Sequence, residues 1–220
     1  MRSLKVIGLV MVMLYAGTSS AFAFHKYSQA DDNGYVNHYT GLSVTRPDRG
    51  VTQAETGCGS YYSGNPVYQT QWVLITSDAQ NWIELGTGHQ CADTKRYWFW
   101  GYGYLGDWYP QGEQGGRTNG QTHTFRIVRS NGSTWTWRVD GTSKGTMTWA
   151  DQGARVRTGL ESYGSAAVVS KYNQYDLEYT LDQGAWTSWS GFDNSSVGAP
   201  EMCGGWNTAT SWRSSENSPC

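Results

Sequence analysis

Two glutamates, Glu84 and Glu161, could carry out acid–base chemistry. Glu84 is the single ionisable residue in the run NWIELG at 81–86, and Glu161 closes the run RVRTGLE at 155–161. A carboxylate pair can take a proton from water with one member and donate a proton to a leaving group with the other. The alternative is that these carboxylates are solvated, or paired with Arg155 and Arg157, and have no catalytic role. Other acids that could partner Glu84 are Glu178, Glu201 and Asp107.

Strand periodicity predicts where these glutamates point. Successive side chains of a strand alternate between its faces. Trp82, Glu84 and Gly86 therefore share one face, and the aliphatic Ile83 and Leu85 share the other. We expect Glu84 to point away from the aliphatic core.

The same alternation applies to the run that carries Glu161. It places Arg155, Arg157, Gly159 and Glu161 on a polar face, opposite Val156, Thr158 and Leu160. Aromatic side chains next to the two glutamates would form the walls of a substrate groove. The candidates are Trp82, Trp98, Trp100 and Tyr102.

Composition predicts the elements that must position these residues. The chain has 12 Trp, 15 Tyr and 28 Gly but only 15% charged residues, which favours an antiparallel β-sandwich or jelly roll with frequent turns and little helix. The segments 106–121 and 198–220 are expected to be loop-like and turn-rich. The expected strands are 35–44, 69–76, 81–87, 96–104, 122–130, 134–139, 146–149, 155–162, 166–170, 175–180 and 186–190.

The first 23 residues are expected to be a secretory signal peptide. Arg2 and Lys5 precede an apolar run over 6–16, and Ala21-Phe22-Ala23 supplies a small-x-small cleavage pattern. The run is shorter than the ~20 residues of a membrane-spanning helix. Residues 24–220 then form one secreted domain, whose segment up to about residue 65 wraps the sandwich edge.

Charge excludes some partners. The mature chain would keep 14 of the 16 Lys and Arg residues, because Arg2 and Lys5 leave with the signal peptide, against 18 Asp and Glu. This mildly acidic balance does not favour binding to nucleic acid or to an anionic membrane. We expect a monomer.

Four cysteines lie in the exported part, and an even count in an oxidising compartment predicts two disulfides. Three pairings are open. Short loops close more easily, which favours Cys58 with Cys91 and Cys203 with Cys220. A zinc site is not favoured, because His89 and Cys91 are the single close His/Cys pair.

The segment Gly141-Thr142-Ser143-Lys144-Gly145 matches the Gly-x-Ser-x-Gly pattern of a serine nucleophile elbow. That motif needs a turn between a strand and a helix, whereas 146–149 is strand-like. A hairpin turn is the preferred interpretation.

The order of these motifs resembles the glutamic peptidases over roughly residues 71–170. Ile-Glu-Leu-Gly at 83–86 leads to Cys91, then to the aromatic run at 97–100, and later to Gly-Leu-Glu at 159–161. Glu84 stands where the fungal eqolisins have Gln and the neprosin-type enzymes have Glu, and 159–161 resembles the Gly-Gly-Glu around neprosin's second glutamate. The resemblance implies a concanavalin A-like sandwich, a Glu84–Glu161 dyad that acts on an extended peptide at acid pH, and no metal or cofactor.

Two other classes of function share these features. A carbohydrate-binding, lectin-like sandwich would stack exposed Trp and Tyr rings on sugars. A jelly-roll glycoside hydrolase would use two glutamates on a polysaccharide, but strand motifs typical of such enzymes, such as Pro-Leu-Val-Glu-Tyr-Tyr or Glu-x-Asp-x-x-Glu, do not occur.

Overall fold

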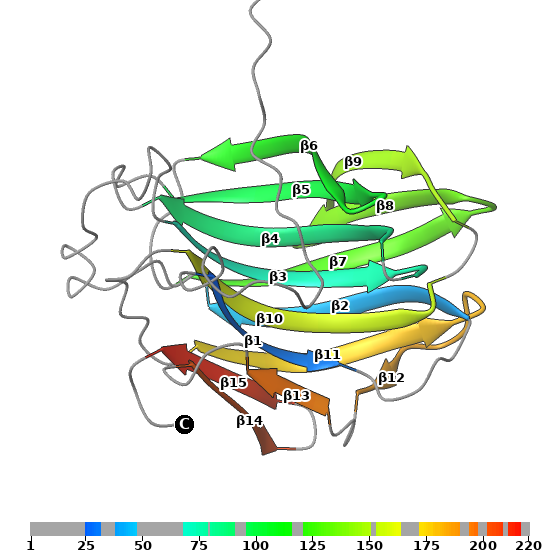
Figure 1. Ribbon diagram of the computed structural model, residues 1–220. Helices are drawn as coiled ribbons and strands as arrows, with labels where there is room; N and C mark the ends of the chain where they lie inside the picture. The colour runs from blue at the N-terminus through cyan, green and yellow to red at the C-terminus, as the bar shows by residue number, and fades with distance from the viewer. Residues whose placement is uncertain are drawn as a thin grey trace, which may run out of the picture.

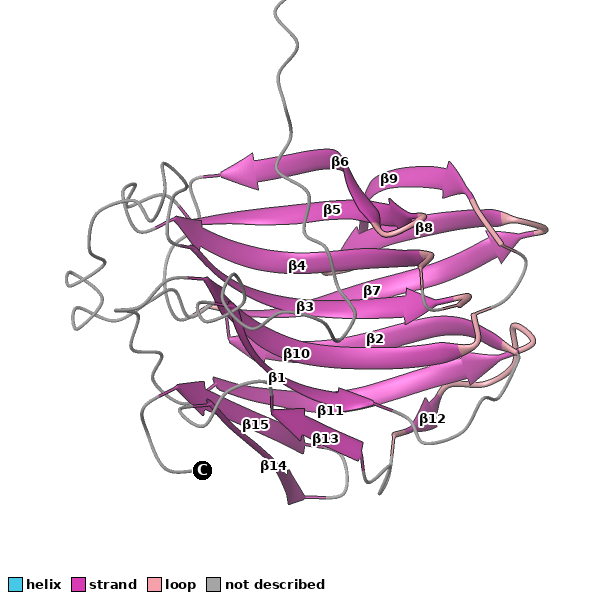
Figure 2. Cartoon of the chain, in the orientation of Figure 1, coloured by secondary structure: helices cyan, strands magenta, loops and turns pink. Residues whose placement is uncertain are grey.

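The computed structural model describes eleven stretches of the chain. These are residues 25–31, 38–47, 68–78, 80–90, 96–115, 121–150, 153–163, 172–189, 194–197, 202–208 and 211–216. The regular elements within these residues are all β-strands, and the described part contains no helix (Figure 2). The described part holds no helix that is long and apolar enough to cross a membrane.

The strands form two antiparallel sheets packed face to face (Figure 1). The seven-stranded sheet has the order β13 (Asn194–Val197), β1 (His25–Asp31), β10 (Arg155–Tyr163), β3 (Tyr68–Thr76), β4 (Trp82–Gln90), β5 (Arg96–Tyr104) and β6 (Asp107–Gly115). The eight-stranded sheet has the order β14 (Met202–Thr208), β15 (Ser211–Glu216), β11 (Tyr172–Leu181), β2 (Tyr39–Pro47), β7 (Thr122–Asn131), β8 (Thr134–Val139) and β9 (Thr142–Thr148), and β12 (Thr187–Ser188) pairs with β11. The predicted antiparallel β-sandwich is confirmed.

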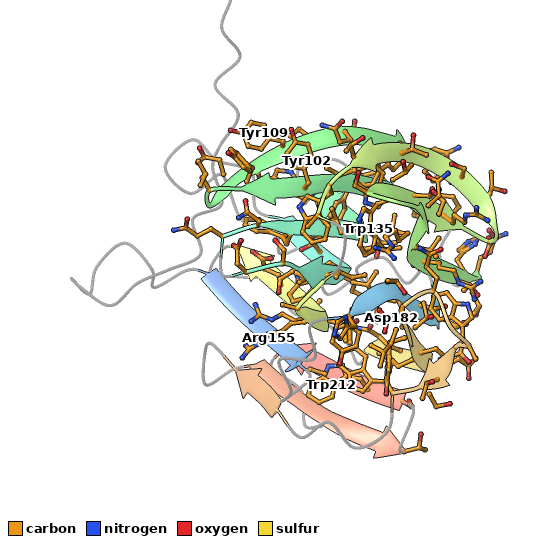
Figure 3. The ribbon with its side chains drawn as sticks, turned by 90° about the vertical axis from the view of Figure 1, so that its right-hand side faces the viewer. Tyr102, Tyr109, Trp135, Arg155, Asp182 and Trp212 are labelled. Atoms are coloured by element: carbon orange, nitrogen blue, oxygen red, sulfur yellow. The ribbon has the colours of Figure 1, made fainter. Side chains whose placement is uncertain are left out.

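The hydrophobic core lies between the two sheets, because each strand turns alternate side chains inward. Several tryptophans fill it, and Figure 3 shows Trp135 between the layers. The seven-stranded sheet contributes Val73, Ile75, Ile83, Leu85 and Val156, and the eight-stranded sheet contributes Leu42, Val44, Phe125, Ile127 and Trp137. The opposite side of the seven-stranded sheet is called the outer face below.

Most expected strands are present. The strand expected at 96–104 matches β5 residue for residue, and those expected at 69–76 and 155–162 match β3 and β10 to within one residue. The strand expected at 186–190 is shorter, at Thr187–Ser188. The segment 166–170 lies outside the described residues.

Two segments expected to be loops are strands. Asp107–Gly115 forms β6, and the tail provides β14 and β15. Strand β6 carries Pro110 and Gly112, which weaken a strand signal in the sequence. Edge strands tolerate such residues because one side of their backbone has no neighbour to pair with.

The hairpin interpretation of the Gly-x-Ser-x-Gly segment is confirmed. Strands β8 and β9 pair antiparallel across a turn at Asp140-Gly141, whose φ angles are 51° and 77°. Two successive positive φ angles define the tight turn that joins adjacent strands. Ser143 therefore lies in a β-strand and cannot form a nucleophile elbow.

A similar turn joins β5 to β6 and carries a strained residue. Leu105 has φ 53° and Gly106 has φ 88°, and the Leu105 side chain is 62% exposed. A positive φ is unfavourable for leucine, whereas asparagine accepts it. We expect Leu105→Asn to raise the free energy of unfolding by about 0.5–1 kcal/mol in urea denaturation. Leu105→Ala keeps the strain and should give no comparable gain; an equal gain would show that the exposed side chain, rather than backbone strain, is responsible.

Candidate functional site

Glu84 projects from the outer face of the seven-stranded sheet. It pairs with Leu74 of β3 and Gly101 of β5, while its neighbours Ile83 and Leu85 lie in the core. The side chain is half-buried, and the Trp82 Nε1–H donates a hydrogen bond of 3.2 Å to Glu84 Oε2. The predicted orientation of Glu84 is confirmed, and Trp82 fixes one carboxylate oxygen.

Glu161 lies on the same outer face, two strands away, with β3 in between. It pairs with Thr70 of β3, and Thr70 is on the same side of β3 as Leu74, the partner of Glu84. Glu161 is only 2% exposed. The sequence pattern therefore placed both glutamates on the correct face, although it could not show that their strands flank the same neighbour.

The side chain of Trp72 starts midway between the two glutamates. Glu161 is level with Thr70, Trp72 follows two residues later, and Leu74 is level with Glu84. Strand geometry puts the two glutamate Cα atoms about 10 Å apart across the sheet and about 13 Å apart along it, hence about 16 Å apart in total. One water can join the two carboxylates only where both side chains lean toward Trp72.

Trp72 was not predicted to be part of the site. It is 1% exposed, and its Nε1–H has no hydrogen-bond partner among the residues that the structure describes. The positions level with Trp72 on the two neighbouring strands are Gly86 and Gly159. Both glycines are visible in the sequence, but only the strand register places them beside Trp72.

Four further aromatic rings lie over glycines of the outer face. A Cβ atom added at each glycine would lie within 2.2–2.5 Å of the ring, so each ring rests directly on the backbone. The pairs are Trp82 over Gly103, Trp108 over Gly101, Phe99 over Gly86, and Tyr97 over Gly88. We call Tyr97, Phe99, Trp82 and Trp108 the outer-face rings; they border Glu84 on β4, β5 and β6.

Three of the four predicted groove aromatics lie on the opposite face. Trp98 is 4% exposed in the core, and Trp100 and Tyr102 pack against the core. Tyr102 stacks on Tyr109 with ring centroids 5.1 Å apart, at the sandwich edge visible in Figure 3. This corrects the expectation that these rings flank Glu84, because their positions in β5 have the opposite parity to those of Tyr97 and Phe99.

Two of the three alternative acids, Glu178 and Asp107, are not neighbours of Glu84. Glu178 pairs with Ser43 in the eight-stranded sheet. Asp107 pairs with Tyr104 and so has the opposite parity to Trp108 on the outer face. Glu201 lies outside the described residues. Arg155 and Arg157 share the outer face with Glu161, as predicted, and Arg157 is level with Glu84 across Leu74.

The expected disulfides stay predictions. Cys58, Cys91 and Cys220 lie outside the described residues, and Cys203 lies in β14. Within the described residues there is no group of three or more His, Cys, Asp or Glu side chains that could hold a metal ion.

Tyr97 is the outer-face ring with a titratable group. Burial of its hydroxyl, together with the negative charge of Glu113, raises its pKa from 10.0 to about 12. Glu113 pairs with Phe99, so it too projects from the outer face. A carboxylate near this hydroxyl opposes formation of the phenolate.

This raised pKa predicts a pH-dependent stability. The folded state keeps the Tyr97 proton while the unfolded chain loses it, so the stabilisation is complete below pH 10 and is lost as the pH rises from about 10 to about 12. Two pH units correspond to at most about 2–3 kcal/mol. Urea denaturation at several pH values should show a smaller loss for Tyr97→Phe than for the wild type. Equal losses in the two proteins would contradict the assignment.

Comparisons with known proteins show the fold. No family model matches the sequence, and no curated protein matches it. The structure of scytalido-glutamic peptidase with a peptide-based transition-state analogue aligns with a TM-score of 0.58 at 12% identity, over 87% of this chain and 98% of the peptidase. The structure of SCP-B, an eqolisin-family peptidase in complex with the tripeptide Ala-Ile-His, aligns with a TM-score of 0.58 at 11% identity over the same shares. A Bacillus licheniformis β-glucanase aligns with a TM-score of 0.35 at 19% identity, over 58% of this chain and 55% of the glucanase.

The chain therefore has the β-sandwich fold found in the eqolisin glutamic peptidases. This agrees with the resemblance noted in the sequence, which rested on the order of its glutamate and aromatic motifs. The predicted jelly-roll, concanavalin A-like class is confirmed at the level of the fold.

Proposed function

We propose that this chain is a secreted glutamic endopeptidase that hydrolyses extended peptides at acid pH. The observation that carries the proposal is that Glu84 and Glu161 project from one face of one sheet, on either side of Trp72, in a fold shared with eqolisin peptidases. The signal-peptide pattern of the first 23 residues supports secretion.

The proposed reaction uses the two carboxyl groups in different protonation states. Glu84 accepts the Trp82 N–H and acts as the carboxylate base, which takes a proton from water as the water oxygen attacks the peptide carbonyl carbon. Glu161 carries a proton and donates it to the amide nitrogen as the C–N bond breaks. The proton held by Glu84 then passes back to Glu161 through the solvent, which restores the starting state. Because one glutamic acid must be protonated, activity falls as the pH rises.

Both carboxyl groups must reach the same peptide bond of the substrate. Their Cα atoms lie about 16 Å apart by strand geometry, so the two side chains would have to converge over Trp72, midway between them. A peptide lying over Trp72 would reach both carboxyl groups. The outer-face rings provide apolar area next to Glu84 for substrate side chains.

Carbohydrate binding is the second candidate, and one observation favours it. Four aromatic rings lie on glycines of a single sheet face, and flat rings of this kind can stack on sugar rings. In this account Glu84 accepts hydrogen bonds from sugar hydroxyl groups, and cleavage of the polysaccharide would identify a glycoside hydrolase.

Incubation of the purified protein with an unfolded protein from pH 2 to pH 7, followed by mass spectrometry of the products, tests the proposal. We expect internal peptide cleavage with a maximum below pH 5, unaffected by a metal chelator. Retention on an insoluble polysaccharide without cleavage of protein would support the lectin-like candidate, and release of sugars would support the glycosidase.

A further inference from the structure

Glu113 is an acidic side chain of the outer face that the proposed reaction does not use. It lies in β6, the edge strand next to β5, and is exposed to solvent. It pairs with Phe99, which is level with Gly86, two residues along β4 from Glu84. Glu113 and Glu84 therefore share one face, with Cα atoms about 12 Å apart by strand geometry.

Three outer-face rings accompany Glu113. The Phe99 ring lies 6.3 Å from Tyr97 at an angle of 57° and 6.1 Å from Trp108 at 83°. All three rings are half-buried, so each keeps part of its surface exposed beside Glu113. Ring faces attract cations, most strongly when a carboxylate contributes negative charge at the same place.

The arginines known on the outer face lie far from Glu113. Glu113 makes no hydrogen bond or ion pair with the described residues, and its charge acts on the Tyr97 hydroxyl. Arg155 and Arg157 of this face lie on β10, four strands from β6, which is about 19 Å. Lys144 donates to Gln114, whose position in β6 has the opposite parity to that of Glu113.

We propose that Glu113, with Tyr97, Phe99 and Trp108, forms a subsite for a basic side chain of the substrate. This inference rests on the proposed peptidase function and names its substrate class: peptides with a lysine or arginine on the β6 side of the bond that Glu84 attacks. The match is one of charge: Glu113 lies beside aromatic rings on β6, while Arg155 and Arg157, which would repel a basic side chain, lie four strands away on β10 together with Glu161.

A peptide series in which a single lysine moves along an otherwise neutral chain tests the subsite. Each lysine peptide is compared with its norleucine counterpart, which keeps the length of the side chain and removes the charge. We expect one lysine position to raise kcat/KM about five- to tenfold over norleucine for the wild type. Glu113→Gln should bring this ratio close to one, and Glu113→Lys should favour glutamate at the same position.

The control is Asp107→Asn, which changes the net charge of β6 equally at a position of opposite parity. It should keep the lysine preference. Calorimetric binding of the same peptides separates the lysine-subsite hypothesis from the peptidase hypothesis. Cleavage without a lysine preference, or with a preference that survives Glu113→Gln, overturns the subsite and leaves the peptidase function intact. Binding that depends on lysine and on Glu113, without cleavage, supports the subsite and contradicts the peptidase function. If there is neither lysine-dependent binding nor cleavage, the subsite and the peptidase function are both contradicted.

Discussion

Glu84→Ala is expected to lower kcat/KM for peptide hydrolysis by about 10²–10⁴-fold, the usual contribution of a positioned acid–base group. The fold should survive, because the Glu84 side chain lies on the outer face and contributes nothing to the core between the sheets. Peptide assays across acid pH measure the activity, and circular dichroism with thermal unfolding measures the fold.

Glu178→Ala is the matched control, because it removes a glutamate from the other sheet. It should leave kcat/KM unchanged. Glu84→Gln is a weaker test, since the fungal eqolisins that the sequence resembles have glutamine at this place. Wild-type activity in Glu84→Ala would exclude Glu84 from the reaction.

Gly86→Ala is expected to reduce the free energy of unfolding by about 2–3 kcal/mol, at the upper end of the usual cost of overpacking. An added Cβ would lie 2.4 Å from the Gln71 carbonyl oxygen and 2.4 Å from Phe99 Cζ. The ring could move, but the carbonyl belongs to the backbone of β3, which is paired on both sides. Peptidase activity should fall as well, because this shift would displace the strands that carry Trp72 and Glu84.

Gly132→Ala provides the comparison. Gly132 has φ 44°, and an added Cβ would meet nothing within 4 Å, so only the unfavourable backbone angle should count, at about 1 kcal/mol. Urea denaturation of both variants distinguishes the two effects. If Gly86→Ala cost no more than Gly132→Ala, the close contact between the strand and the Phe99 ring would not constrain the site.

Strand alternation explains why the orientation of the glutamates could be predicted from the sequence. Ile83 and Leu85 identify the core side of β4. Val156, and Leu160 with the same parity, identify the core side of β10, so Glu84 and Glu161 had to point outward. This inference is local, because it depends only on neighbours within each strand.

The same alternation could not identify the rings beside Glu84. In β5 both faces are aromatic, with Trp98 and Trp100 toward the core and Tyr97 and Phe99 on the outer face. Hydrophobicity therefore did not distinguish the two sets. The distinguishing feature is long-range: Phe99 and Tyr97 lie over Gly86 and Gly88 of the neighbouring strand, which requires knowledge of the register.

The order of the strands in the sheets could not be predicted from the sequence either. Strand β10 pairs with β3 although about 90 residues separate paired positions such as Glu161 and Thr70. This pairing places Trp72 between the two glutamates. Strand β6 was missed because its Pro and Gly residues are typical of loops, while pairing with β5 on one side is enough to hold it as an edge strand.

A double-mutant cycle of kcat/KM on one peptide tests most directly whether Glu84 and Glu161 act together. The variants are Glu84→Ala, Glu161→Ala and the double substitution. Residues that work as one catalytic unit are strongly non-additive, so we expect each single variant to be about as inactive as the double variant. Losses that multiply in the double variant, or activity that survives both substitutions, would contradict a shared Glu84–Glu161 site.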